Sequence, residues 1–228
     1  MATISFFGGV GTVTGSKYLL EHNGTRVLVD CGLFQGLKEL RERNWQDPPF
    51  DPASISAVII THAHIDHTGY LPRLVKLGFN GPVFTSRATG DLLKILLPDS
   101  ARLQEEDADY RNRHALTKHE PALPLYDERD AKAALQLLQP VANGGGPVKI
   151  ADGFSAEFTV AGHIIGASLV LVTIDGAKAD GEDLKILFSG DLGHYDQAIL
   201  KDPAIPPVCD YMLVESTYGD RLHGDVAS

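Results

Sequence analysis

The stretch AVIITHAHIDHTGY, residues 57–70, places an apolar run directly before a cluster of histidines. Residues 57–61 are expected to form a buried strand, because short apolar runs rich in β-branched residues are typical of one. His62 and His64 follow two positions apart, so that in extended or loop geometry both can point at one ion. A merely histidine-rich polar loop is the simpler alternative. A metal site is favoured because histidine is the commonest neutral metal ligand near pH 7.

Further ligands for such a site lie next to these histidines and in two later turns. Asp66 and His67 follow at a spacing that suits a second ion. Later, VAGHIIGASLV and ILFSGDLG each place one histidine or aspartate at the end of an expected strand. Each is weak alone, because such residues are common in turns. Together they complete a set: His62, His64 and His163 for one ion, Asp66 and His67 for the other, and Asp191 bridging both.

The composition is that of a soluble globular chain of 228 residues, 43% hydrophobic and 22% charged. No apolar run approaches the ~20 residues of a membrane helix, and the N-terminus lacks the basic start of a secretory signal. The only cysteines, Cys31 and Cys209, make no disulfide framework, which favours the reducing cytoplasm. A net charge of −10 disfavours broad nucleic-acid binding but leaves room for a locally cationic, metal-bearing cleft.

The expected elements run in the order strands, helices, strands. Asn23-Gly24 predicts a hairpin turn between two apolar runs. Residues 87–116 and 127–138 have helical patterns, and residues 143–147, NGGGP, mark a loop. Four apolar runs after this loop predict strands: FSAEFTVAG, SLVLVTID, LKILFSGD and DYMLVES. We therefore expect an α/β layered sandwich, in which two stacked sheets have helices outside.

The ligand motifs resemble those of a known superfamily. THAHIDH, the later GH and the later SGD are similar, in that order, to motifs of the metallo-β-lactamase superfamily, and LVDCG (residues 28–32) resembles its first motif. The resemblance implies an αββα sandwich that holds two zinc ions through the ligand set given above. It also implies that Asp30 orients the ligands from behind.

A narrower resemblance rests on LVESTYGDR, residues 213–221, which is similar to the first extra motif of the β-CASP branch of nucleases. This resemblance implies a zinc-dependent phosphodiesterase that cleaves RNA through a metal-activated hydroxide. It assigns catalytic roles to Asp66 and Glu215, with Glu215 orienting a histidine that protonates the leaving oxygen. The glycine-rich segment 8–16 could line the cleft. Ser189 and Thr217 are candidate phosphate contacts.

The chain departs from the branch at its C-terminal end. There, an inserted domain follows the glutamate, and the returning chain supplies two more histidines. Neither His194 nor His223 has a suitable position to replace them. We therefore expect residues 1–208 to be the N-terminal part of a metallo-β-lactamase domain and residues 209–228 to begin the insertion, in a fold incomplete at its C-terminal end. A weakened second metal position and self-association into a homodimer would follow.

Other functions remain open at this point. A thioesterase or other small-ester hydrolase would carry the same ligands, because fold and metal site do not fix the substrate. An iron-dependent oxygenase would need one metal, whereas Asp66 and His67 argue for two. A non-enzymatic binding module would have broken motifs, yet the ligand positions are intact. An inactive truncated fragment also fits the short chain, and the motifs do not separate RNA from DNA as substrate.

Overall fold

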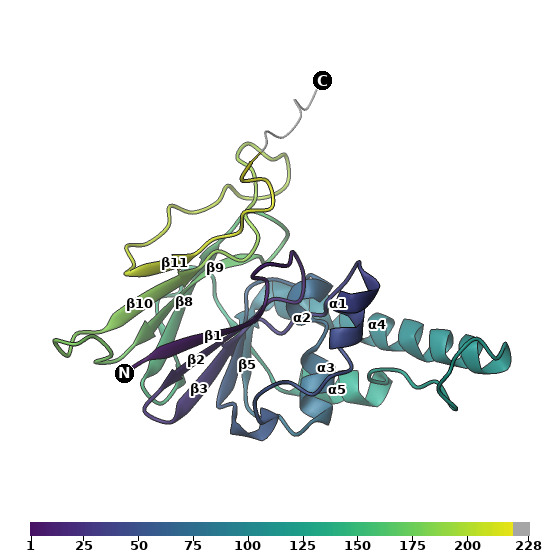
Figure 1. The fold of residues 1–228 in the computed structure, drawn as a ribbon. Coiled ribbons are helices and arrows are strands. Elements are labelled where there is room, and N and C mark those ends of the chain that lie inside the picture. The colour runs from purple at the N-terminus through teal and green to yellow at the C-terminus, as the bar shows by residue number, and fades with distance from the viewer. Residues whose placement is uncertain (221–228) are drawn as a thin grey trace.

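The computed structural model describes residues 1–220, which form two stacked β-sheets with helices along one side (Figure 1). The first sheet has six strands, in the spatial order β1 (Thr3–Gly8), β2 (Lys17–His22), β3 (Thr25–Val29), β4 (Ala57–Ile60), β5 (Val83–Ser86) and β6 (Leu138–Val141). The second has five, in the order β11 (Tyr211–Leu213), β10 (Leu184–Phe188), β9 (Ser168–Ile174), β8 (Phe154–Val160) and β7 (Val148–Ala151).

The helices cover the face of the first sheet that points away from the second (Figure 1). They are α1 (Lys38–Arg43), α2 (Ile65–Thr68), α3 (Leu71–Lys76), α4 (Arg87–Arg113) and α5 (Glu128–Gln136), with a short 3-10 helix, η1, at Pro52–Ser54. The long helix α4 projects beyond the sheets (Figure 1).

Two cores follow from the alternation of side chains along the central strands. In β4, Val58 and Ile60 belong to the core under the helices, whereas Ala57 and Ile59 belong to the core between the sheets. Residues on a strand point alternately to opposite faces, so an apolar run without alternation predicts burial on both sides. All four residues of β4 are buried. This double burial fixes the strand that ends directly before the histidines.

The carboxyl ends of the central strands lie at one edge of the molecule. β3, β4 and β5 run parallel, so that their carboxyl ends meet at one edge. The second sheet comes to the same edge, because the Ser168 N–H at the start of β9 donates to the Thr61 carbonyl at 3.0 Å. The turn between β8 and β9 and the turn after β10 therefore lie beside the histidine motif.

The predicted α/β sandwich is confirmed, and residues 1–220 supply one helix layer and both sheets. One local expectation was wrong, and one strand was missed. The helical pattern of residues 127–138 ends earlier, at Gln136, because Leu138 pairs with Val83 and starts β6. β7 was not expected at all. The domain boundary at residue 208 stays a prediction.

Candidate metal centre

Four predicted ligands meet at the shared edge of the two sheets. His62 and His64 follow β4, His163 lies in the turn between β8 and β9, and Asp191 lies in the turn after β10. Each offers one ligand atom, and these atoms all lie within 4.8 Å of one another. Each sheet thus contributes two of the four residues.

The separations of the donor atoms fit a tetrahedral ion. His64 Nδ1 lies 3.1 Å from His62 Nε2 and 3.2 Å from His163 Nε2. Asp191 Oδ2 is 3.5 Å from Nε2 of both His62 and His163 and 3.9 Å from His64 Nδ1. Tetrahedral zinc ligands at ~2.0–2.1 Å from the ion lie about 3.3 Å from one another. The residues therefore match the coordination shell that such an ion requires.

Asp66 and His67 lie on the other side of Asp191. His67 Nε2 is 3.2 Å from Asp191 Oδ1 and 3.9 Å from Asp66 Oδ2. The two oxygens of Asp191 thus face different groups, since Oδ2 is the one near the other three histidines. This is the arrangement that a bridging carboxylate needs, and the assignment of these ligands to one or two ions remains a prediction.

Asp30 lies behind the histidines and is 1% exposed. Its Oδ1 accepts from the Thr61 N–H at 2.8 Å, its Oδ2 accepts from the Thr61 hydroxyl at 2.9 Å, and Oδ2 lies 2.7 Å from His67 Nδ1. A carboxylate that accepts the outer N–H of a histidine fixes the tautomer and the orientation of the ring. With Nδ1 held in this way, Nε2 of His67 faces Asp191.

Burial and the carboxylates set the charge of the ligands in opposite directions. Burial lowers the pKa of His62 and of His163, although Asp191 opposes the effect in both. Burial also favours the neutral form of His67, but Asp30 and Asp191 outweigh it and raise the pKa of His67 to about 10. Burial acts to raise the pKa of Asp191, yet its histidine partners hold it well below its usual range.

Glycines allow the ligand loops to approach closely. A Cβ on Gly32 would lie 1.5 Å from the Asp66 carbonyl oxygen, and one on Gly193 would lie 1.9 Å from the Gly162 carbonyl oxygen, next to His163. The glycine-rich segment reaches the same place, because the Ser16 N–H donates to the Asp66 carbonyl at 2.9 Å. The segment predicted to line the cleft is thus bonded to the histidine motif.

The remaining candidate residues from the sequence lie outside this group of ligands. The Glu215 Oε1 accepts from the Leu192 N–H at 2.7 Å, a partner that sequence reasoning missed. The Ser189 hydroxyl is engaged internally, because it donates to the Gly190 carbonyl and accepts from the Glu215 N–H. Thr217 is exposed, and His223 lies outside the described residues.

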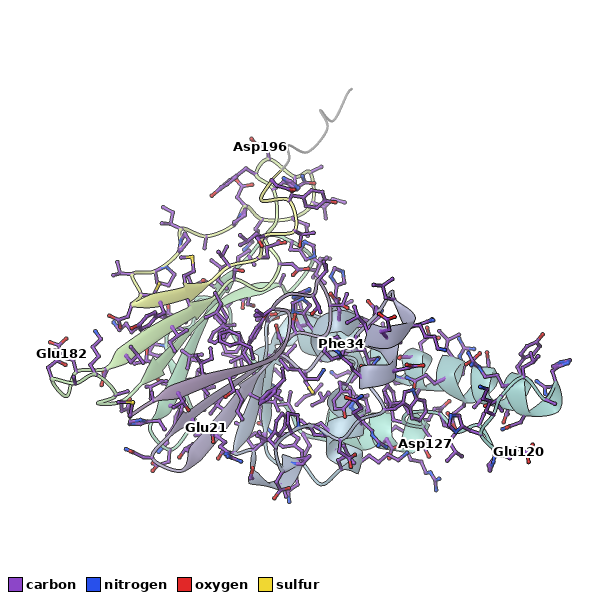
Figure 2. All side chains as sticks on the ribbon, viewed as in Figure 1. Glu21, Phe34, Glu120, Asp127, Glu182 and Asp196 are labelled. Carbon is purple, nitrogen blue, oxygen red and sulfur yellow. The ribbon has the colours of Figure 1, made fainter. Side chains whose placement is uncertain are left out.

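Lys17 is a buried residue that the motifs did not indicate. Its Nζ donates to the carbonyl oxygens of Gly15 and Gly32 and lies over the rings of Phe34 and Tyr70 (Phe34 is labelled in Figure 2). In the sequence it begins an ordinary strand pattern, KYLLEH, in which a lysine is expected to face solvent. No sequence motif marks Lys17 as buried, and it directly follows the glycine-rich segment 8–16.

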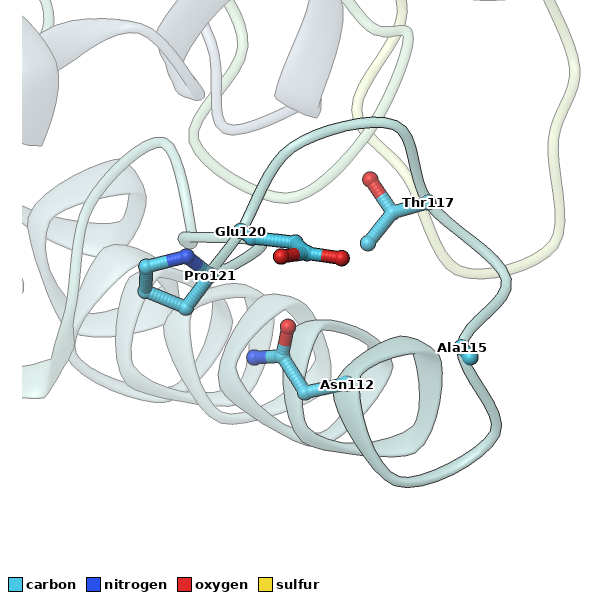
Figure 3. A pocket seen from close by; sticks show the side chains of 5 residues that line it. All are labelled: Asn112, Ala115, Thr117, Glu120 and Pro121. Atoms are coloured by element: carbon cyan, nitrogen blue, oxygen red, sulfur yellow. The ribbon is translucent and has the colours of Figure 1, made fainter.

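A separate pocket lies near the far end of α4. Asn112, Ala115, Thr117, Glu120 and Pro121 line it (Figure 3). The Asn112 side chain fixes the returning chain, since it donates to the Ala122 carbonyl and accepts from the Ala122 N–H. None of the predicted ligands lines this pocket, so the chemistry of the metal motif is not associated with it.

Comparison with known proteins identifies the class of protein that this site defines. Residues 10–222 match the family described as the Metallo-beta-lactamase superfamily, and the chain belongs to that superfamily. Ribonuclease TTHA0252 of Thermus thermophilus is 39% identical over 217 residues, which cover 95% of this chain and 44% of the relative. Transcription termination factor FttA of Methanocaldococcus jannaschii is 29% identical over 219 residues, covering 95% of this chain and 31% of the relative.

The solved structures include BJP-1, a subclass B3 metallo-beta-lactamase of Bradyrhizobium japonicum, with a TM-score of 0.48 and 20% identity. The match covers 82% of this chain and 59% of that one. The chain spans less than half the length of the two curated relatives. The predicted resemblance to the superfamily and to its RNA-processing nucleases is confirmed. No helix within residues 1–220 is long and apolar enough to cross a membrane.

Proposed function

We propose that this chain is the metal-binding part of a zinc-dependent phosphodiesterase that acts on RNA. The observation that carries the proposal is the tetrahedral spacing of donor atoms from His62, His64, His163 and Asp191. Imidazole and carboxylate donors at this spacing suit zinc. The similarity to a protein named as a ribonuclease supports RNA as the substrate.

In this proposal each residue has a defined task. His62, His64 and His163 hold the first ion, Asp66 and His67 hold a second, and Asp191 contacts both. Bound zinc would activate water for attack on a phosphodiester and neutralise charge in the transition state. Asp30 keeps the ring of His67 oriented, so that its Nε2 stays available to the ion.

The net charge of the chain supports a metal-dependent mode of RNA binding. A chain with a formal charge of −10 repels a polyanion in general. Two divalent ions carry four positive charges, and the carboxylates of Asp66 and Asp191 carry two negative ones. The metal centre would therefore be a positive region on an otherwise acidic surface. RNA binding is therefore expected to depend on the metal and to stay weak without it.

The test compares two substrates. The zinc-loaded chain is incubated with labelled single-stranded RNA and, separately, with an S-acyl thioester, alongside a His64→Ala variant and a sample treated with a chelator. Cleavage of RNA that needs both zinc and His64 is the expected result. Hydrolysis of the thioester alone would replace the proposal with the small-ester hydrolase.

An inactive chain that still binds zinc through these residues would restrict the proposal to a metal-binding part of a longer enzyme. The same RNA assay on a longer form of the protein would then decide the activity. The cytoplasmic location and the homodimer stay predictions.

A further inference from the structure

Glu215 contacts the turn that carries Asp191, and this contact points to a role in building the metal centre. The Leu192 N–H, directly after Asp191, donates to the Glu215 Oε1 at 2.7 Å. The Glu215 N–H in turn donates to the Ser189 hydroxyl at 3.1 Å. One residue therefore bonds the turn on both sides of the aspartate.

The backbone beyond Glu215 adds a further connection. The Ser189 N–H donates to the Leu213 carbonyl at 2.9 Å, where β11 runs parallel to β10. Residues 213–215 and residues 189–192 are thus joined by three hydrogen bonds. Only one of them, the bond from the Leu192 N–H, is accepted by the side chain of Glu215.

The other sides of the turn are fixed by close packing. Gly190 has a φ of +52°, and a Cβ there would lie 2.9 Å from the Thr61 side chain. The Gly193 N–H donates to the Ala161 carbonyl at 2.9 Å, next to the turn of His163. Asp191 is therefore confined by the end of β4, by the β8–β9 turn and, on the third side, by Glu215.

We infer that Glu215 is a positioning residue for Asp191, which acts through the Leu192 N–H to hold the carboxylate at the metal centre. This inference rests on the proposed function. It differs from the role that the family resemblance implies for Glu215, which is to orient a histidine during catalysis. Holding the Leu192 N–H requires an acceptor oxygen, and its loss would change metal affinity, whereas orienting a catalytic histidine would change proton transfer. Metal titrations therefore separate the two roles.

The variants follow from this chemistry. Glu215→Ala removes the acceptor, whereas Glu215→Gln keeps an oxygen that can accept from the same N–H. Asp202→Ala is a matched control, because the Asp202 Oδ1 accepts from the Asp196 N–H at 2.9 Å, in the same part of the chain. Asp191→Ala tests the metal centre itself.

The measurements are titrations of the metal-free chain with Zn²⁺ and with Co²⁺, whose visible spectrum reports ligand geometry. We expect Glu215→Ala to weaken affinity by about 10-fold or more, the range seen when a residue that supports a ligand is lost, and to change the Co²⁺ spectrum. Glu215→Gln and Asp202→Ala should both stay close to the parent chain. Thermal unfolding of the metal-free variants confirms that each is folded.

Three results would overturn the inference. Glu215→Ala could bind both ions as the parent chain does, or Glu215→Gln could lose as much affinity as Glu215→Ala. A loss in Asp202→Ala equal to that in Glu215→Ala would show general loosening of the segment. If Asp191→Ala itself binds metal normally, the proposed metal centre fails, and that failure is distinct from the other three.

Discussion

Asp30 has a left-handed backbone, with a φ of +57°, and a buried carboxylate that joins two parts of the histidine motif. It accepts from Thr61 on one side and contacts His67 on the other. Few side chains tolerate this conformation, and asparagine and aspartate are enriched in it. Position 30 therefore requires a residue that tolerates a left-handed backbone and that also carries a hydrogen-bond acceptor for Thr61 and His67.

We predict that Asp30→Ala lowers the free energy of unfolding by about 3 kcal/mol, because it leaves the Thr61 N–H and the His67 ring without their buried partner. It should also weaken zinc binding by about 10- to 100-fold. Denaturant unfolding of the metal-free chain and a zinc titration measure the two effects. Asp30→Asn keeps an acceptor and suits the backbone, so an equal loss in both variants would contradict this account.

Lys17 predicts a dependence of stability on pH. Burial lowers its pKa from 10.5 to about 8, against the opposing influence of Cys31. Between these values the unfolded chain holds a proton that the folded chain releases. The contribution of Lys17 to the free energy of unfolding should therefore rise with pH in this window, by up to ~1.4 kcal/mol per pH unit. Below about pH 8 this contribution no longer changes with pH.

Lys17→Met cannot titrate, so it isolates this contribution. The difference in unfolding free energy between the parent chain and Lys17→Met should shift in favour of the parent by about 2 kcal/mol from about pH 8 to about pH 9.5. Denaturant titrations at the two pH values measure it. A difference that stays constant would show that the lysine keeps its proton in the fold.

At the level of residues, the sequence predicted the candidate ligands and one of their supports, Asp30, but not the other supports. His62, His64, His163 and Asp191 stand in motifs with recognisable spacing, and the structure brings them together. Lys17 and the partner of Glu215 depend on which backbone groups meet in space, which no local pattern encodes.

At the level of elements, the strands before the ligands were the most predictable part. The apolar run of β4 and the hairpin of β2 and β3 follow from side-chain periodicity and from one turn. β6 was not predicted, because only its pairing with β5 overrides a local pattern that continues the helix. The helical turn α2 inside the histidine motif was likewise not predicted.

The packing of loops gives a prediction at Gly32. An added Cβ would overlap the Asp66 carbonyl, so Gly32→Ala must push the histidine motif away from β3. We expect Gly32→Ala to lower the free energy of unfolding by about 3 kcal/mol or more, since overpacking typically costs about 1–3 kcal/mol and this overlap is severe. Zinc binding should weaken as well. Gly90→Ala is the control, because its nearest contact would be an ordinary 3.5 Å and helix α4 favours alanine. Equal stability of the two variants would contradict the close approach.

At the level of the whole molecule, metal binding and folding should be linked. Zinc at about 100 times its dissociation constant adds about 2.7 kcal/mol to the folded state. For a domain of this size, this corresponds to a rise of about 5–10 °C in melting temperature. Thermal scans with and without zinc test it, with Mg²⁺ as the ion that these ligands should not favour. A His64→Ala variant that shows the full zinc shift would contradict the ligand assignment.

Exposed apolar side chains lie before, within and directly after β11, and they bear on association of the whole molecule. Ile199, Ile205 and Val208 are each about nine-tenths exposed, and Tyr211 and Val214 are more than half exposed. Contiguous exposed apolar surface favours association. Sedimentation at several protein concentrations would measure the predicted homodimer.

The position of the ligands on both sheets has one more consequence. His64 and His163 are 99 positions apart, so an ion held by both would act as a reversible cross-link that closes a long loop. Closing a loop of this length removes entropy from the unfolded chain that, in the chain-entropy account of a disulfide, is worth several kcal/mol. In the unfolded chain, His62 to His67 are neighbours, but His163 and Asp191 are remote. Tight capture of the ion and closure of the two sheets over their shared core should therefore be one cooperative event.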